Sequence, residues 1–412
     1  MVSIKSLGFY IIIGYSVYNV GNILFFYLNF STLYLTLSVG LLYPALKLSS
    51  KRITLEQHEI FAFLLIALVL LTILSQNIFL KDHIISETNV STIENVTAVT
   101  IISIMWFFIG GTCAQAEFNE NKFLALFISL SLLAAMISAS GEELRVSYRT
   151  AEQEAGASVS HLVLERPIIL LLVYSYAISG NFKYWILAIG TMALFFMGGR
   201  TALFLFATSG GLLAYRNNLI SGFLGSLVLF GSISILFLIG VSTGYIDTDI
   251  RAVREILLLD GLEQDGSYAG RIARFEASLP LLWEQFWIGN YSLVTEQHKG
   301  WGGYIHNLLS AWQLYGFFVF SAIVMSLIYC LKRMSWFLRI SNKPIDIFGA
   351  LMLMYVILSS VLSKYVGWKM LSFMLGFWML RNSQMKRRAR KKKKIKRKRY
   401  GSNIPRGVTT EN

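Results

Sequence analysis

The sequence predicts an all-α, polytopic integral membrane protein with about twelve transmembrane helices. Of its 412 residues, 55% are hydrophobic and 14% are aromatic, and the mean hydropathy is +0.57. Soluble domains are roughly half apolar. Several apolar runs also reach the roughly 20 residues that a helix needs to cross a bilayer. Together these observations favour a membrane protein over a soluble one.

Apolar runs of helical length give the position of each predicted span. The first run has no small-residue cleavage site before Asn29, so we expect a retained span rather than a removed signal peptide. In chain order the predicted spans are 8–29, 32–47, 59–80, 97–113, 123–140, 166–180, 184–199, 201–216, 219–243, 307–331, 345–362 and 365–380.

The net charge of +14 is concentrated in the last residues of the chain. Residues 381–412 hold fourteen Lys or Arg and one Glu, mostly in the run "KRRARKKKKIKRKRY". Such a juxtamembrane segment fixes orientation and contacts anionic lipid headgroups, and we favour this role over nucleic-acid binding. We therefore expect a transmembrane domain over 1–380 and a disordered cytoplasmic tail over 381–412.

The positive-inside rule places this tail and the basic connection 331–343 in the cytoplasm, and counting back places the N-terminus there too. Three hydrophilic segments then lie outside: 81–96, 140–165 and 244–306. The last is about sixty residues long, far beyond an ordinary connection. We expect it to be a functional outer loop that carries short helices.

Arginine dominates the basic residues that this topology places outside. We count eight Arg and three Lys outside, against four Arg and seven Lys inside, with the tail set apart and Lys369 placed within the last span. Because the planar guanidinium binds phosphate through two hydrogen bonds, this excess predicts an anionic outer ligand, with phosphate or diphosphate the natural candidate. The alternative is pairing with nearby acids, and it is equally open for the arginines at 145, 149, 251 and 254. The eight are Arg145, Arg149, Arg166, Arg200, Arg251, Arg254, Arg271 and Arg274.

Arg200 lies at the junction of two apolar spans, with almost no loop to carry it into water. An ionisable residue at membrane depth is costly and indicates function by default. Gly198 and Gly199 would let another backbone or a lipid-linked ligand approach it closely.

Two further segments join Arg200 in a recognisable pattern. "AGRIARFEASLPLLWEQFWIGNYS" has a Gly-Arg pair that leads an amphipathic helix and a turn at Gly289, and "YIHNLLSAWQLYGFFVFSAIV" opens a span with His-Asn and has Gly316 about three turns later. With Gly211 eleven residues after Arg200, these segments resemble the O-antigen polymerase and O-antigen ligase superfamily of membrane glycosyltransferases. The resemblance spans roughly residues 185–330.

The resemblance implies a role for each matching residue. Arg200 and Arg271 would bind the diphosphate of an undecaprenyl-linked glycan, and His306 would be the general base at the acceptor hydroxyl. Arg274, three residues after Arg271 on the same helical face, is a plausible second phosphate contact. For His306 the alternative is a packed structural histidine.

The implied function is polymerisation of undecaprenyl-diphosphate-linked repeat units of an O-antigen, capsule or exopolysaccharide. It would take place at the periplasmic face of the bacterial inner membrane, with a flippase and a chain-length regulator as possible partners. The diphosphate is already a good leaving group, so the enzyme must neutralise developing negative charge and activate a hydroxyl. Guanidinium groups can neutralise the charge, and a histidine can activate the hydroxyl. We therefore expect no metal and no other cofactor.

Aromatic residues at the end of the long loop are possible contacts for the sugar or the acceptor. Trp283, Trp287, Tyr304 and Asn307 are the residues that we select there. The alternative for the aromatic ones is the interfacial belt that membrane proteins share.

Two other functions stay open at this point. An O-antigen ligase would use the same donor but transfer the glycan to the lipid A core. We favour a polymerase because eight residues separate Asn307 from Gly316, where the superfamily often has nine and the ligases are more uniform. A transporter or flippase would instead predict charges near the bilayer midplane and internal repeats, neither of which we find.

Overall fold

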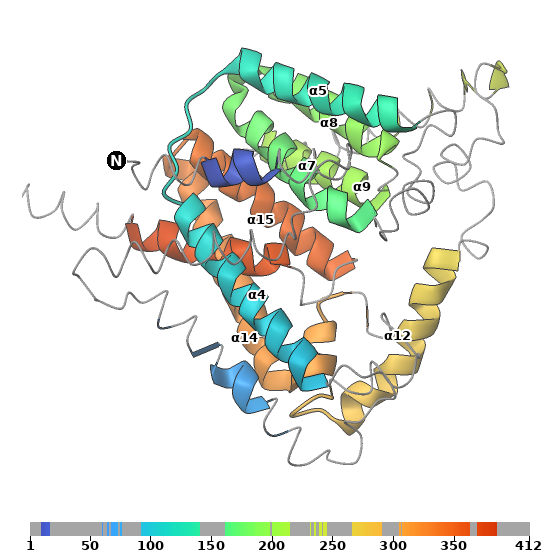
Figure 1. The fold of residues 1–412 in the computed structure, drawn as a ribbon, viewed down its shortest axis with the longest axis vertical. Coiled ribbons are helices and arrows are strands. Elements are labelled where there is room, and N and C mark those ends of the chain that lie inside the picture. Colours follow the sequence, from blue (N-terminus) through green and yellow to red (C-terminus); the bar gives the residue numbers. More distant parts are fainter. Residues whose placement is uncertain are drawn as a thin grey trace, which may run out of the picture.

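The computed structural model describes an arrangement of helices, and no strand occurs among the described residues (Figure 1). These residues are 10–16, 92–140, 161–197, 200–214, 266–290, 305, 307–362 and 369–384, with scattered positions at 60–75 and 231–244. The elements are α4 (Thr92–Cys113), α5 (Lys122–Ser140), α7 (His161–Ile178), η3 (Gly180–Phe182), α8 (Lys183–Phe196), α9 (Arg200–Ala214), α12 (Gly266–Glu284), α14 (Ser310–Ile340), α15 (Pro344–Leu362) and a last helical segment, 369–384.

Within the described part of the chain, helices occupy eight of the predicted span ranges, from 97–113 onwards. The predicted span 32–47 lies outside the described residues, and those at 8–29, 59–80 and 219–243 are described only in part. By length and hydropathy, two described helices can cross a membrane, Ser310–Arg339 and Pro344–Leu362. The total of about twelve spans therefore stays a prediction.

Helix α14 is longer than predicted, because it continues to Ile340 instead of ending at residue 331. The residues from 332 to 340 include neither Gly nor Pro, so nothing stops the helix after its apolar part. It ends where Ser341 is extended, with φ −142° and ψ 133°. Pro344 then begins α15, a position at which its missing N–H costs nothing.

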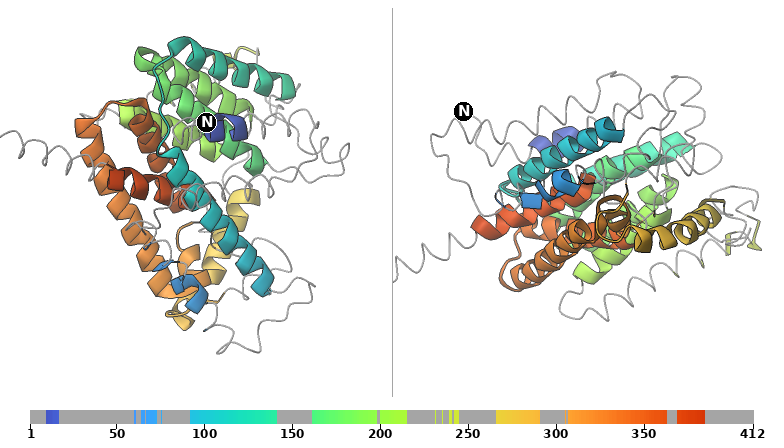
Figure 2. Two further views of the ribbon diagram at one scale, coloured as in Figure 1. Left: turned by 60° about the vertical axis from the view of Figure 1, so that its left-hand side comes forward. Right: turned by 90° about the horizontal axis from the view of Figure 1, so that it is seen from below.

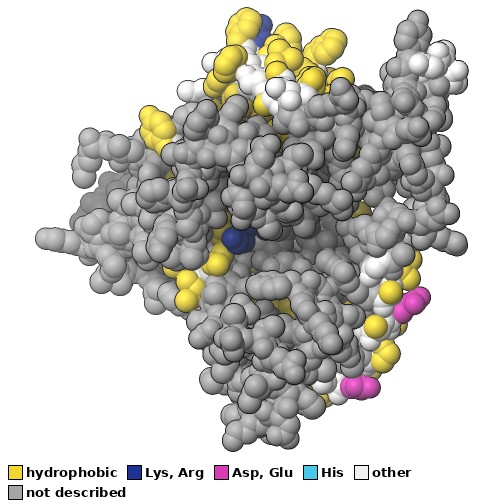
Figure 3. All heavy atoms as spheres, turned by 45° about the vertical axis from the view of Figure 1, so that its right-hand side comes forward, with side chains coloured by type: hydrophobic (Ala, Val, Ile, Leu, Met, Phe, Trp, Pro, Cys, Tyr) yellow, Lys and Arg dark blue, Asp and Glu magenta, His cyan; other side chains and the backbone are white. Residues whose placement is uncertain are grey.

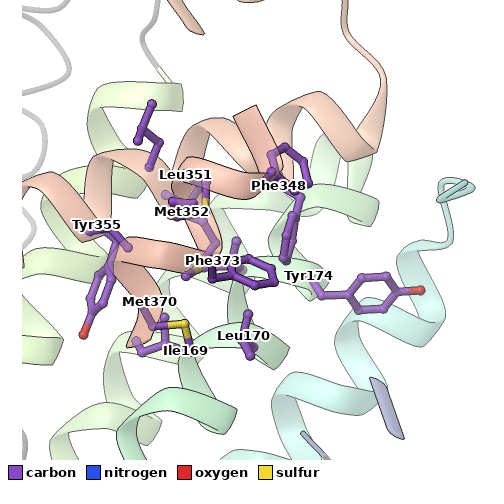
Figure 4. Close-up of a cluster of buried hydrophobic side chains, with 14 of the residues drawn as sticks. Ile169, Leu170, Tyr174, Phe348, Leu351, Met352, Tyr355, Met370 and Phe373 are labelled. Carbon is purple, nitrogen blue, oxygen red and sulfur yellow. The ribbon is translucent and has the colours of Figure 1, made fainter. Parts of the chain in front are cut away.

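The core lies where α7, α15 and segment 369–384 meet. Helix α7 is buried on all sides from residue 167 to its end at Ile178, which is typical of a helix that is apolar all round. Figure 4 shows Ile169 and Leu170 of α7 beside Met370 and Phe373 of the last segment, with Leu351 of α15 in the same cluster. Helices α5, α8 and α9 complete the bundle around this core.

Two glycines let α4 and segment 369–384 approach each other closely. A Cβ atom added at Gly110 would overlap the backbone of Phe373, and one added at Gly376 would overlap the backbone of Phe107. Small residues at such crossings are the usual means by which apolar helices gain packing contacts in a membrane.

Hydrogen bonds tie several helix ends together at one end of the bundle. The Arg381 guanidinium donates to the Asp346 carboxylate at 2.7 Å and to the carbonyl of Ala114 at 3.3 Å. The Asn121 N–H donates to the carbonyl of Ile178 at 2.9 Å. We call this the tail end, because the basic residues 385–412 follow from it.

The other end of each helix forms what we call the opposite end. At a rise of about 1.5 Å per residue, the starts of α7, α9 and α14 and of segment 369–384 lie far from the tail end. The end of α15 lies there too, and α12 continues past the bundle (Figure 2, right). Apart from α12, each of these helices thus has one end at the tail end of the bundle and the other at the opposite end.

Large apolar side chains cover outward faces of several helices, and Figure 3 shows some of them gathered at one side of the molecule. On α5 and α14 they recur at spacings of three, four or seven residues, which places them along one face. They are Phe123, Phe127, Leu130 and Ile137 on α5, and Phe318, Met325, Ile328 and Leu331 on α14.

Candidate functional site

The turn after α12 and the break in α14 contact each other through two glycines. Gly289 has φ 64° and Gly316 has φ 76°, both in the region that glycine adopts without strain. A Cβ atom at Gly289 would overlap backbone atoms of Trp312, Gln313 and Gly316, and one at Gly316 would overlap those of Trp287 and Ile288. The two segments therefore meet backbone to backbone, and we call this contact the glycine junction.

The break at Gly316 supplies the hydrogen bonds that hold the junction. In an uninterrupted helix the Phe317 N–H would donate to the carbonyl of Gln313. Here the Phe317 N–H donates to the carbonyl of Phe286 at 3.0 Å, and the carbonyl of Gln313 accepts from the Asn290 N–H at 2.8 Å. Both backbone groups that the helix loses are thus satisfied by the turn.

Gln313 also fixes the segment just before α14. Its side chain, 6% exposed, accepts a hydrogen bond through Oε1 from the Ile305 N–H at 3.0 Å. Two residues later, Oδ1 of Asn307 accepts from the Leu309 N–H at 2.8 Å and closes a tight turn. His306 lies outside the described residues, but both of its chain neighbours are held in place by these bonds.

Seven aromatic rings surround the glycine junction, and two of them are predicted sugar or acceptor contacts. Trp283 and Trp287 are 66% and 59% exposed, so each offers a free surface. Each also contacts other aromatic rings: Trp283 lies 5.6 Å from Trp312, and Trp287 stacks on Phe318 at 5.4 Å, as measured between ring centroids. The rings are Trp283, Phe286, Trp287, Trp312, Phe317, Phe318 and Phe320.

The remaining predicted site residues are placed only by their backbones. Arg200 is the first residue of α9, and Arg271 and Arg274 lie in the first half of α12. The backbone of Arg271 lies on the same side of α12 as the buried Ser278, seven residues later. Their side chains, and all of Tyr304, lie outside the described residues.

The helices that carry the predicted site residues contact one another in a series. Helix α12 packs against α14, α14 packs against α15, and α15 packs against α9. Helix α12 thus contacts α14, which begins just after His306 in the chain, whereas Arg200 belongs to α9, which is linked to α14 only through α15 in this series.

Several polar residues of the opposite end were not predicted from the sequence. Gln313 was not singled out, although a buried amide in an apolar helix is a usable signal. Glu165 is 5% exposed, and its Oε1 accepts a hydrogen bond from the hydroxyl of Tyr355 at 2.5 Å. A carboxylate at the start of an apolar span was visible in the sequence, but its partner, 190 residues away, was not.

A cavity of about 640 Å³ lies at the tail end, far from the glycine junction. Its walls come from the connections between α4 and α5, between α7 and α8, and between α14 and α15, and they include Glu120, Lys122, Lys183 and Asn342. No predicted site residue lines this cavity.

No family model matches the chain, and no curated protein sequence matches it.

Proposed function

We propose that the chain is a membrane-embedded glycosyltransferase that polymerises undecaprenyl-diphosphate-linked repeat units at the periplasmic face of a bacterial inner membrane. The observation that carries the proposal is the glycine junction. It joins the turn after α12, the helix that bears Arg271 and Arg274, to α14, which begins just after His306 and Asn307 in the chain. These segments were selected separately in the sequence, and together they offer the anion ligands and the base that the reaction requires.

Two features of the fold support a membrane location. Outward faces of α5 and α14 carry rows of exposed apolar side chains, an arrangement that favours contact with lipid over contact with water. The helix ends at the opposite end, including the start of α14 and the end of α15, are also those that the charge distribution assigns to the periplasm.

In the proposed reaction an acceptor hydroxyl attacks the anomeric carbon of the lipid-linked glycan. His306 takes the hydroxyl proton while the new bond from the acceptor oxygen to the anomeric carbon forms. The bond from that carbon to the diphosphate oxygen breaks, and undecaprenyl diphosphate leaves with the electron pair. Arg271, Arg274 and Arg200 offset the negative charge that develops on the leaving group.

Purified protein in lipid nanodiscs, given a lipid-linked repeat unit, tests this proposal. We expect chain lengthening without added metal, and a decrease of roughly 100-fold or more when His306→Ala removes the base. His298→Ala, a change of the same kind in the same outer loop, is the matched control and should retain activity.

Three results would contradict the polymerase assignment. They are transfer of the glycan to a lipid A core instead of to a second lipid-linked unit, movement of the lipid-linked glycan across the bilayer without glycosyl transfer, and full activity of the His306→Ala protein.

A further inference from the structure

Two charged neighbours at the start of α7 point in different directions. Successive residues of a helix are turned by about 100°, so Glu165 and Arg166 do not face each other. The Glu165 carboxylate is directed to α15, where it accepts the 2.5 Å hydrogen bond from Tyr355. Arg166 is therefore directed elsewhere, away from the acid beside it in the chain.

Arg166 has a buried hydrogen-bond donor that the described residues leave unpaired. Its Nε atom is inaccessible to solvent and has no hydrogen-bond partner there. Lys369 is the first residue of the last helical segment, and its neighbour Met370 lies beside Ile169 of α7, one turn after Arg166 (Figure 4). The two positive charges therefore lie near enough to repel each other. Both side chains are half-buried, and like charges held together near a low-dielectric region are costly unless an anion lies between them.

We propose that Arg166 and Lys369 form a binding site for the diphosphate group of an isoprenoid lipid. The guanidinium offers a planar pair of donors and the ammonium a point charge, a combination that suits phosphate oxygens. The site lies at the opposite end of the bundle, where the headgroup of a lipid embedded beside the helices would be found. The choice of lipid rests on the proposed function.

A second diphosphate site has a clear use in that function. A polymerase joins two molecules that each carry a lipid diphosphate, the donor and the acceptor. Arg200, Arg271 and Arg274 belong to α9 and α12, whereas Arg166 and Lys369 belong to α7 and the last segment. The structure therefore has separate elements to hold each substrate by its charged group.

Binding of farnesyl diphosphate to purified protein in nanodiscs, measured by native mass spectrometry, tests the site without requiring turnover. We expect the unchanged protein to bind two molecules, one at each diphosphate site, and Arg166→Gln and Lys369→Gln each to weaken the binding of one of them about tenfold or more, because each removes a charge-assisted contact. Arg166→Lys retains the charge but not the planar pair and should bind with intermediate affinity. The matched controls are Arg339→Gln and Lys332→Gln, both exposed near the tail end, and they should bind like the unchanged protein.

Farnesol and inorganic diphosphate distinguish the contribution of the isoprenoid chain to binding from that of the diphosphate. Farnesol should bind equally to all variants, since it lacks the anion, and inorganic diphosphate should compete only weakly. Equal binding of farnesyl diphosphate by the Arg166→Gln/Lys369→Gln protein and the unchanged protein would overturn the site. Competition by inorganic diphosphate at the same concentration as the lipid would overturn the lipid ligand. Should glycan polymerisation fail while this binding persists, the proposed function falls and the site stands.

Discussion

Gly316 shows how one missing side chain determines the way in which two segments meet. Its break in α14 frees a carbonyl and an N–H group, and the turn at Gly289 satisfies both. The sequence identified each glycine as part of a motif. It could not predict their contact, because a backbone-to-backbone contact between residues 27 positions apart leaves no periodic pattern.

Replacing Gly316 by Ala should destabilise the protein by at least about 2 kcal/mol. The backbone angles of Gly316, φ 76° and ψ 176°, are unfavourable for alanine, and the new methyl group would overlap the backbone of Trp287. Thermal unfolding in detergent measures the change. Gly14→Ala is the matched control, because nothing lies within 4 Å of its added Cβ atom and alanine favours the helix there. Equal unfolding temperatures of the two variants would contradict the junction.

Gln313→Leu should cost about 1–3 kcal/mol of stability, since it leaves the buried N–H of Ile305 without an acceptor. Gln313→Glu retains an oxygen at that position and should recover part of the loss. Chemical denaturation of both proteins measures the difference. Ser335→Ala, which removes an exposed hydrogen bond within the same helix, should have little effect. A loss no greater than that of Ser335→Ala would show that the Gln313 side chain does not hold Ile305.

At the scale of elements, α12 is an amphipathic helix with an exposed apolar row. Ile272, Phe275, Leu279 and Trp283 are spaced by three or four residues and lie on one side, and Glu284 is exposed on another. Figure 3 shows acidic and apolar side chains exposed along this helix. The amphipathic character was expected from the resemblance of this segment to the Gly-Arg motif. The sequence did not predict that α12 packs mainly through its last turns, because that depends on the glycine junction.

The apolar row of α12 should lie at the membrane surface, as amphipathic helices do. Spin labels attached at Leu279→Cys and Ala277→Cys test this, since both positions are exposed but lie on different sides of the helix. We expect oxygen, which concentrates in lipid, to relax the label at 279 more strongly, and a water-soluble nickel chelate to relax the label at 277. The native Cys113 and Cys330 are buried and should react little. The same response at both positions would contradict a membrane-facing row.

At the scale of the whole molecule, apolar runs in the sequence located most of the described helices to within a few residues. Hydropathy succeeds because a buried or lipid-facing helix must be apolar over its length. It cannot show which helices touch. The bond between Glu165 and Tyr355 and the ion pair between Asp346 and Arg381 join residues 190 and 35 positions apart. Both depend on packing that no local pattern records.

Breaking the ion pair at the tail end should destabilise the bundle by about 3–5 kcal/mol, because removing one partner leaves the charge of the other buried and unpaired. Asp346 and Arg381 are 2% and 4% exposed, so water cannot replace the lost contact. We expect Asp346→Asn to be harmful alone and Asp346→Asn/Arg381→Gln to be less so. A double-mutant cycle of unfolding temperatures measures the coupling. Arg339→Gln, an exposed change nearby, serves as the control, and additive effects of the two substitutions would refute the coupling.

Gln313 also affects which insertions and deletions the sequence could tolerate during evolution. Its backbone carbonyl binds Asn290 and its side chain binds Ile305, so both ends of the segment 291–304 are anchored to a single residue. The cost of closing a loop rises only slowly with its length. Insertions or deletions between these anchors would therefore leave α12 and α14 in register. The sequence of this segment could thus diversify without any change in the contacts that hold the two helices together.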